Sequence, residues 1–102
     1  MGTRDKGKSN KAVQLGLPLM KRVYGGEEIE FYPLGKYIVI QPGVCGGRPT
    51  VINRRIGGRD IIGALARGDK PKQIAEDFRI PLAALREAVA LAEQYDYEQS
   101  YA

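Results

Sequence analysis

The sequence predicts a mainly α fold with a small β part, in which a three-helix bundle containing a helix-turn-helix follows a β-hairpin. Residues 72–91, KQIAEDFRIPLAALREAVAL, carry apolar side chains at helical spacing in two short runs joined by a turn. Residues 29–40 are rich in β-branched and aromatic side chains on both sides of Pro33-Leu34-Gly35. That pattern is typical of two strands joined by a hairpin turn.

Four segments follow one another along the chain. Residues 1–28 are expected to form a flexible basic N-terminal arm, because Gly, Lys, Ser and Asn at its start leave little to bury. Residues 29–56 hold the β-hairpin, a Gly-rich loop and a strand candidate at Thr50–Ile52. Residues 57–96 form the three-helix domain, and residues 97–102 a C-terminal tail. A chain of 102 residues has room for one small core.

Glycine and proline mark the limits of the first two helices. The first helix is expected to begin at Arg59 or Asp60 and to end at Gly68, which suits a left-handed cap. The second is expected to have Asp69 as its N-cap and Pro71 in its first turn.

The second and third helices make the expected helix-turn-helix, the unit that lays its second helix in the DNA major groove. Ala75 is small enough for the third helix to approach closely, and this helix is expected to run from about Pro81 to Tyr95. Arg79 occupies the turn position where glycine is common. The match to a helix-turn-helix is therefore partial.

The net charge of +4 is modest, but the charges are unevenly distributed. Lysine and arginine dominate the first quarter and the middle of the chain, whereas Glu27, Glu28, Glu30 and the end of the chain are acidic. This asymmetry favours a surface that meets phosphates, although a basic stretch can also be a solvated face. The residues expected to contact nucleic acid are Arg54, Arg55, Arg59, Lys70, Lys72, Arg79 and Arg86.

The third helix has few side chains that could read bases. Its opening turn, Pro81-Leu82-Ala83-Ala84, offers none, and Arg79 and Arg86 are the only long donors near it. Sequence-specific readout through this helix alone would be weak. Leu82 and Leu85 are interpreted as a packing, partner or dimer contact, and a homodimer is expected.

An enzyme is the least supported class of function. The chain has no histidine and a single cysteine, Cys45, so it lacks the usual partners of a zinc site or a cysteine nucleophile. The segment GVCGGRPT is glycine-rich like a phosphate loop, but no lysine precedes Thr50, and Pro49 has no backbone donor. No catalytic residue, metal or cofactor is predicted.

Composition is ordinary for a soluble globular domain, with 43% hydrophobic and 27% charged residues. No apolar run approaches the roughly 20 residues that span a bilayer. The charged start, MGTRDKGKSN, is unlike a signal peptide. We expect a cytoplasmic protein without membrane contact.

The segment YIVIQPGVCGGRPTVINRRI leads from a strand through Gly-Gly-Arg-Pro into a short box that ends in Arg-Ile. Together with the helical pattern after it, this order resembles domain-of-unknown-function family 433 over residues 37–95. The box departs from the family pattern at Asn53 and Arg54, where glycine and threonine are usual. The matching positions are Gly46, Gly47, Arg48, Pro49, Val51, Ile52, Arg55, Ile56, Gly68, Ile74, Ala75, Leu85, Ala88, Val89 and Ala92.

The resemblance implies a homeodomain-like three-helix core. Some members of that family look like antitoxins paired with toxic ribonucleases, so it also implies a toxin as a possible partner. The fold follows from it more directly than a function.

Two functions stay open. The first is a DNA-binding regulator or the antitoxin of a toxin–antitoxin pair, which contacts phosphates through basic residues beside the helix-turn-helix. The second is a non-enzymatic protein-interaction or dimerisation module that uses the same fold without DNA. Only the first predicts duplex binding that weakens steeply with salt.

Overall fold

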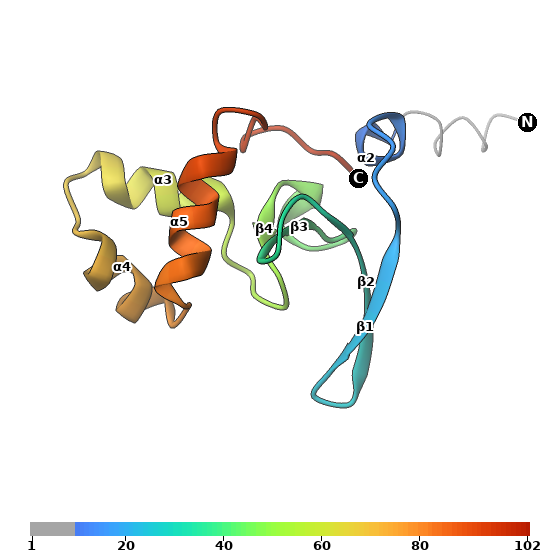
Figure 1. Ribbon diagram of the computed structural model, residues 1–102, viewed down its shortest axis with the longest axis horizontal. Helices are drawn as coiled ribbons and strands as arrows, with labels where there is room; N and C mark the ends of the chain where they lie inside the picture. Colours follow the sequence, from blue (N-terminus) through green and yellow to red (C-terminus); the bar gives the residue numbers. More distant parts are fainter. Residues whose placement is uncertain (1–9) are drawn as a thin grey trace, which may run out of the picture.

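A computed structural model describes residues 10–102 (Figure 1). The first nine residues of the expected N-terminal arm lie outside the described part. In chain order the elements are α2 (Lys11–Gln14), β1 (Met20–Tyr24), β2 (Glu27–Pro33), β3 (Ile38–Ile40), the 3-10 turn η1 (Cys45–Gly47), β4 (Thr50–Val51), α3 (Gly58–Ala66), α4 (Pro71–Phe78) and α5 (Leu82–Leu91).

The strands form one four-stranded antiparallel sheet in the order β1-β2-β3-β4, and the helices α3, α4 and α5 follow it in the chain. Helix, including the 3-10 turn, accounts for 37% and strand for 19% of residues 10–102. The fold is therefore α/β, and the prediction of a mainly α three-helix bundle with a minor β part was wrong. The sheet is larger than expected because its first strand lies in the segment that was interpreted as an arm.

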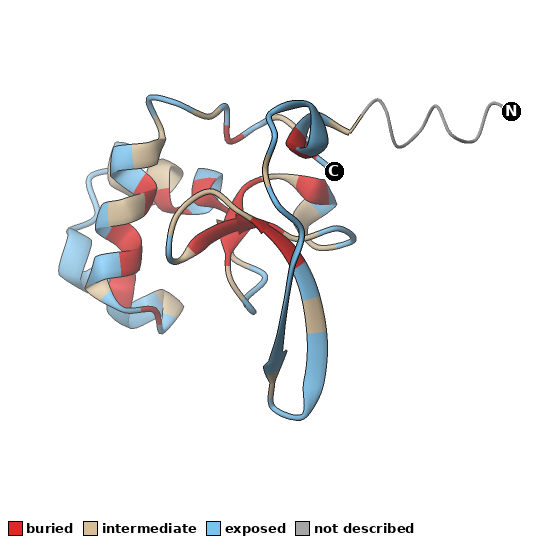
Figure 2. Ribbon diagram, turned by 45° about the vertical axis from the view of Figure 1, so that its right-hand side comes forward, coloured by how far each residue is buried: buried red, intermediate tan, exposed pale blue. Residues whose placement is uncertain are grey.

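Strand β1 reads MKRVY and pairs with β2 from Met20 opposite Phe31 to Tyr24 opposite Glu27. The two strands are joined by Gly25 and Gly26, both with positive φ (58° and 84°), as a two-residue hairpin turn requires. This hairpin projects from the body of the molecule (Figure 1) and is mostly exposed (Figure 2). Strand β1 was not predicted from the sequence, because its basic residues next to glycine were interpreted as part of a flexible arm.

The hairpin expected around Pro33-Leu34-Gly35 is formed by β2 and β3, with Tyr32 opposite Ile40. Its loop is held by a side chain that the sequence did not single out. The carboxylate of Glu87, on α5, accepts hydrogen bonds from the backbone N–H groups of Lys36 (3.0 Å), Tyr37 (2.7 Å) and Ile38 (2.7 Å). The sheet is thereby fixed to α5.

The helix limits follow the expected glycine and proline signals, with corrections at the N-cap of α4 and at the end of α5. Gly68 has φ +95° and lies two residues beyond Ala66, the last residue of α3. Pro71 is the first residue of α4. The N-cap of α4 is Lys70 rather than Asp69, whose carboxylate instead pairs with Arg67. Helix α5 ends at Leu91, four residues before the expected limit at Tyr95.

The turn between α4 and α5 is short and contains a strained residue. Arg79 is left-handed, with φ 56° and ψ 49°, in the position where glycine was expected. Ala75 and Ile80 are buried where the two helices meet. One core joins β3 and β4 to all three helices (Figure 2), and its buried branched aliphatic members are Ile38, Val51, Ile61, Ile74, Ile80 and Leu85.

The C-terminal segment is packed against the rest of the molecule: Tyr97 belongs to this core, and Tyr101 belongs to a second cluster with Ala12, Tyr32 and Ile40. Tyr97 and Tyr101 are each only 6% exposed. Tyr97 lies against Gly58, where an added Cβ would come within 2.7 Å of its ring, and its hydroxyl donates to the Ala88 carbonyl. Burial raises the pKa of Tyr97 to about 12.

Candidate functional site

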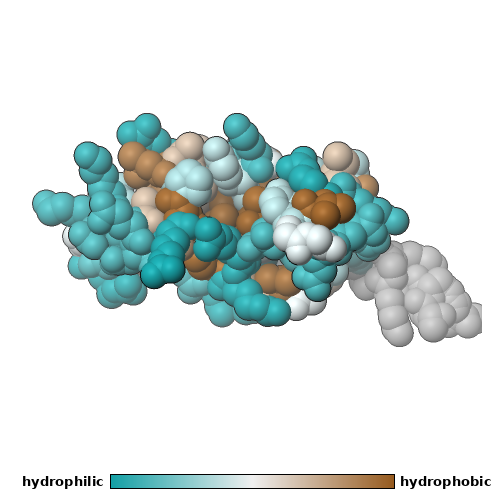
Figure 3. Space-filling model, turned by 90° about the horizontal axis from the view of Figure 1, so that it is seen from below, coloured by the Kyte–Doolittle hydropathy of each residue, from teal (hydrophilic) through white to brown (hydrophobic). Residues whose placement is uncertain are grey.

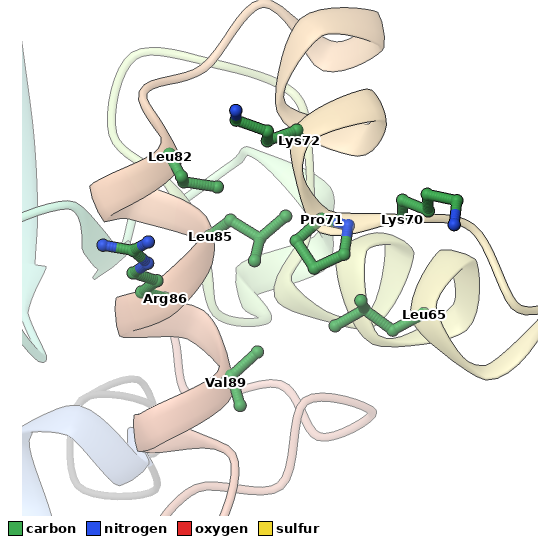
Figure 4. A pocket seen from close by; sticks show the side chains of 8 residues that line it. All are labelled: Leu65, Lys70, Pro71, Lys72, Leu82, Leu85, Arg86 and Val89. Atoms are coloured by element: carbon green, nitrogen blue, oxygen red, sulfur yellow. The ribbon is translucent and has the colours of Figure 1, made fainter.

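A groove of about 820 Å³ lies between α5, the end of α3 and the start of α4 (Figure 4). Leu82, Leu85 and Val89 of α5 point across it toward Pro71, and Leu65 of α3 closes its far side. Lys70, Lys72 and Arg86 stand at its rim. The groove therefore has an aliphatic floor and a basic edge.

Helix α5 places these residues by its periodicity. Ala84, Leu85 and Ala88 face the core, so the outward stripe consists of the half-buried Leu82 and the exposed Ala83, Arg86, Val89 and Ala90. Val89 is 43% exposed. Arg86 is the only hydrogen-bond donor among the side chains of that stripe.

Three arginines line a second hollow, of about 410 Å³, on another side of α3. Arg55 comes from the turn after β4, whereas Arg59 and Arg67 come from α3 and the residue after it. An added Cβ at Gly63 would lie 3.9 Å from the Arg67 guanidinium, so that side chain folds back along the helix. Phe78 of α4 forms part of the wall.

The acids near this arginine hollow are already engaged. Asp60, which also lines it, accepts a hydrogen bond of 2.8 Å from the Gly57 N–H and so caps α3. Arg59 pairs with Glu98 at 2.9 Å, and this hydrogen bond raises the pKa of the Arg59 guanidinium. Arg67 and Asp69 are 3.4 Å apart. Both ion pairs are exposed, so each is weak.

The groove and the arginine hollow open on opposite sides of α3. No residue lines both. Leu65 faces the groove and Gly63 faces the hollow, and residues two apart in a helix project about 200° from one another. The seven basic residues predicted from the sequence therefore do not form a single patch.

The structure divides those residues into three groups. Lys70, Lys72 and Arg86 edge the groove, and Arg55 and Arg59 line the arginine hollow. The other two line neither: Arg54 lies beside the β1–β2 hairpin in a hollow that includes Glu27, and Arg79 is in the α4–α5 turn.

Sequence reasoning also missed several contributors. Leu85, predicted as a partner contact, is only 2% exposed and is mainly a core residue. Leu65, Val89 and Arg67 were not proposed for any site. Val89 could have been found from its position one helical turn beyond Arg86, whereas Arg67 could not be assigned without the path of the chain around α3.

Comparisons with known proteins identify a family and nothing beyond it. No helix of the described part is long and apolar enough to cross a membrane. Neither the curated proteins nor the solved structures contain a match. Residues 38–92, more than half of the chain, match the family described as Protein of unknown function (DUF433). The strand, Gly-rich loop and three helices described above thus lie within the matched region, and the chain belongs to the DUF433 family.

Proposed function

We propose that this chain is a non-enzymatic protein-binding module that holds an apolar segment of a partner in the groove beside α5. The observation that carries the proposal is the groove's aliphatic floor, which Leu65, Leu82 and Val89 leave partly exposed to solvent. Apolar grooves between helices commonly receive the apolar face of an amphipathic helix. Burial of such a face would supply the binding free energy.

The groove's charge indicates the chemistry of the partner. Lys70, Lys72 and Arg86 are exposed and form no ion pair with any residue from 10 to 102. No acidic side chain lines the groove. A segment with an apolar face and flanking carboxylates is complementary to both the floor and the rim.

Val89→Asp tests this proposal, because it places a charge on the apolar floor without opening the core. The matched control is Val23→Asp, on the projecting hairpin, where the side chain is 63% exposed. A photo-crosslinking residue at position 83 would first identify the partner in cells. Calorimetry with that purified partner should then show affinity weakened at least roughly tenfold by Val89→Asp. Equal effects of the two variants would contradict groove binding.

DNA binding is a second candidate function, favoured by the arrangement of α4 and α5. Their three-residue connection, with left-handed Arg79 and buried Ala75, supports the predicted helix-turn-helix. Six predicted contact residues are exposed and unpaired within the described chain: Arg54, Arg55, Lys70, Lys72, Arg79 and Arg86. Because the α5 stripe has few donors, we expect phosphate contacts with little sequence selectivity.

Fluorescence anisotropy with a labelled duplex of arbitrary sequence tests this second candidate. Affinity should fall steeply as salt rises from 50 to 200 mM, since cations that neutralise phosphates release counterions. Binding that is absent, or indifferent to salt, would remove DNA from the proposed functions.

Protein binding and DNA binding together are the activities of an antitoxin, and a toxic ribonuclease is one partner that the family resemblance suggests. Co-expression with the product of an adjacent reading frame tests this version directly, by rescue of growth.

A homodimer remains a prediction, which sedimentation equilibrium can test. Edge-to-edge pairing of β1 with its symmetry copy is disfavoured, because Lys21 and Arg22 would face like charges.

A further inference from the structure

We infer that the arginine hollow beside α3, and not the groove beside α5, is the site that holds a phosphate of the duplex backbone. The inference rests on the DNA binding proposed as the second candidate function. It assigns the contact to Arg55, Arg59 and Arg67, of which Arg67 belongs to no expected site.

The chemistry of the hollow suits a phosphate. Guanidinium groups are planar, carry several donors in a fixed geometry and bind phosphate oxygens in pairs. Three of them line a space of about 410 Å³. The hollow also adjoins the N-terminal turn of α3, where the Arg59 N–H has no acceptor among the described residues. That free donor and the helix dipole add to the attraction for an anion.

The neighbouring acids would not prevent binding. Asp60 is held by the Gly57 N–H as a cap. Glu98 and Asp69 contact Arg59 and Arg67 in exposed pairs, which are weak and screened by salt. A phosphate can therefore displace these carboxylates at small cost and leave them solvated.

The groove is the less suitable place for a phosphate although it also has three cations. Its floor is aliphatic, so a phosphate there would lose water over the floor and gain donors only from the rim. Two of its three cations are lysines, which act as point charges and lack the paired donors of arginine. The two sites thus make opposite predictions for the same probe.

Two triple variants separate the sites. Arg55→Ala/Arg59→Ala/Arg67→Ala and Lys70→Ala/Lys72→Ala/Arg86→Ala each remove three positive charges, which lowers the net charge from +4 to +1. Both should keep the wild-type circular dichroism spectrum and Tm within a few degrees, because all six side chains are exposed. Anisotropy with a labelled duplex is then measured for both variants across a salt series.

The arginine variant should bind the duplex roughly 50-fold more weakly and lower the slope of log K against log salt by about 3, as expected for three lost phosphate contacts. The lysine-rich variant should lose less than about threefold. Equal losses would mean attraction by net charge alone, and a larger loss in the lysine-rich variant would place the duplex over the groove. Either result overturns the inference.

Two further arms define the ligand. The triple variant Arg55→Lys/Arg59→Lys/Arg67→Lys keeps the positive charge but removes the guanidinium groups. A duplex affinity that is still reduced at least roughly fivefold supports paired guanidinium contacts, whereas full affinity contradicts them. Duplex binding should survive 10 mM inorganic phosphate, because one free ion cannot match many backbone contacts; loss of binding at that concentration would overturn a duplex-specific site. If the wild type binds no duplex at all, the DNA function itself fails, and groove binding by a protein partner remains separately testable.

Discussion

The groove and the arginine hollow each carry three cations, yet they differ in what lies beneath the charges. Aliphatic side chains of α3 and α5 form the floor of the groove, whereas the lining of the hollow combines its arginines and the Asp60 cap with Ile56 and Phe78. Lysines dominate one rim and arginines the other. The comparison shows that the number of basic residues does not indicate whether a site suits a protein or a polyanion. The side chains that lie between the charges are the better guide.

The largest expected effect comes from Glu87→Ala, which should perturb the groove and spare the hollow. Loss of the three N–H contacts would leave the part-buried donors of Tyr37 and Ile38, and the exposed donor of Lys36, without this acceptor, and we expect a loss of about 3 kcal/mol in the free energy of unfolding. Urea denaturation measures it, with the exposed Glu93→Ala as control at less than about 0.5 kcal/mol.

Glu87→Ala also separates the two surfaces functionally. Because α5 is the wall of the groove, its looser attachment should weaken partner binding in the folded variant while duplex binding is retained. A variant that lost duplex binding selectively would show that α5, and not α3, carries the nucleic-acid contact. Gly35, in the β2–β3 loop, leaves room for the Glu87 carboxylate, since an added Cβ would lie 2.5 Å from it.

High pH should act on the other region, through Tyr97 beneath the start of α3. Its folded pKa of about 12 lies above the ordinary value of 10.0, so folding favours the protonated phenol. This stabilisation is fully present below pH 10 and is lost as the pH rises through 12. Unfolding titrations should show a loss of about 2–3 kcal/mol over this window. The Tyr97→Phe variant has no phenol to titrate, so over this pH window its free energy of unfolding should fall by about 2–3 kcal/mol less than that of the wild type. Parallel plots of unfolding free energy against pH for the two proteins would be inconsistent with the proposed burial effect.

The smallest expected effect is that of Arg79→Gly, which sharpens the comparison because Arg79 lines neither surface. A left-handed residue with a Cβ is strained, so glycine should raise the free energy of unfolding by about 0.5–1 kcal/mol. Thermal denaturation measures this gain, and affinity for duplex and partner should change by less than about twofold. A marked loss of duplex affinity would restore Arg79 as a contact.

The sequence predicted the helices better than the sheet, for local reasons. Gly68, Pro71 and Pro81 act on their own neighbours, so α3, α4 and α5 lie close to their expected ranges. Strand β1 has charged residues at consecutive positions and almost no buried side chain, so it gives no alternating pattern. The two-glycine turn after it was the available signal.

The candidate sites were predictable only as residue types. Arg55, Arg59, Lys70 and Arg86 were identified from their charge, but the division between two sides of α3 depends on how the helix is rotated in the fold. The contact of Glu87 spans about 50 positions in the chain, and Tyr97 is fixed by the small size of Gly58. Long-range partners of this kind leave no periodic trace in a sequence.

The segments on either side of the family-matched region are joined to each other as well as to that region. The Ala12 N–H donates to the Tyr101 carbonyl (2.9 Å), and the Tyr101 N–H donates to the carbonyl of Gly47 (2.8 Å). A fragment cut to residues 38–92 would expose the Gly47 acceptor and empty the notch at Gly58 that the ring of Tyr97 fills. The unit that must be expressed for folding is therefore larger than the unit by which the family is recognised.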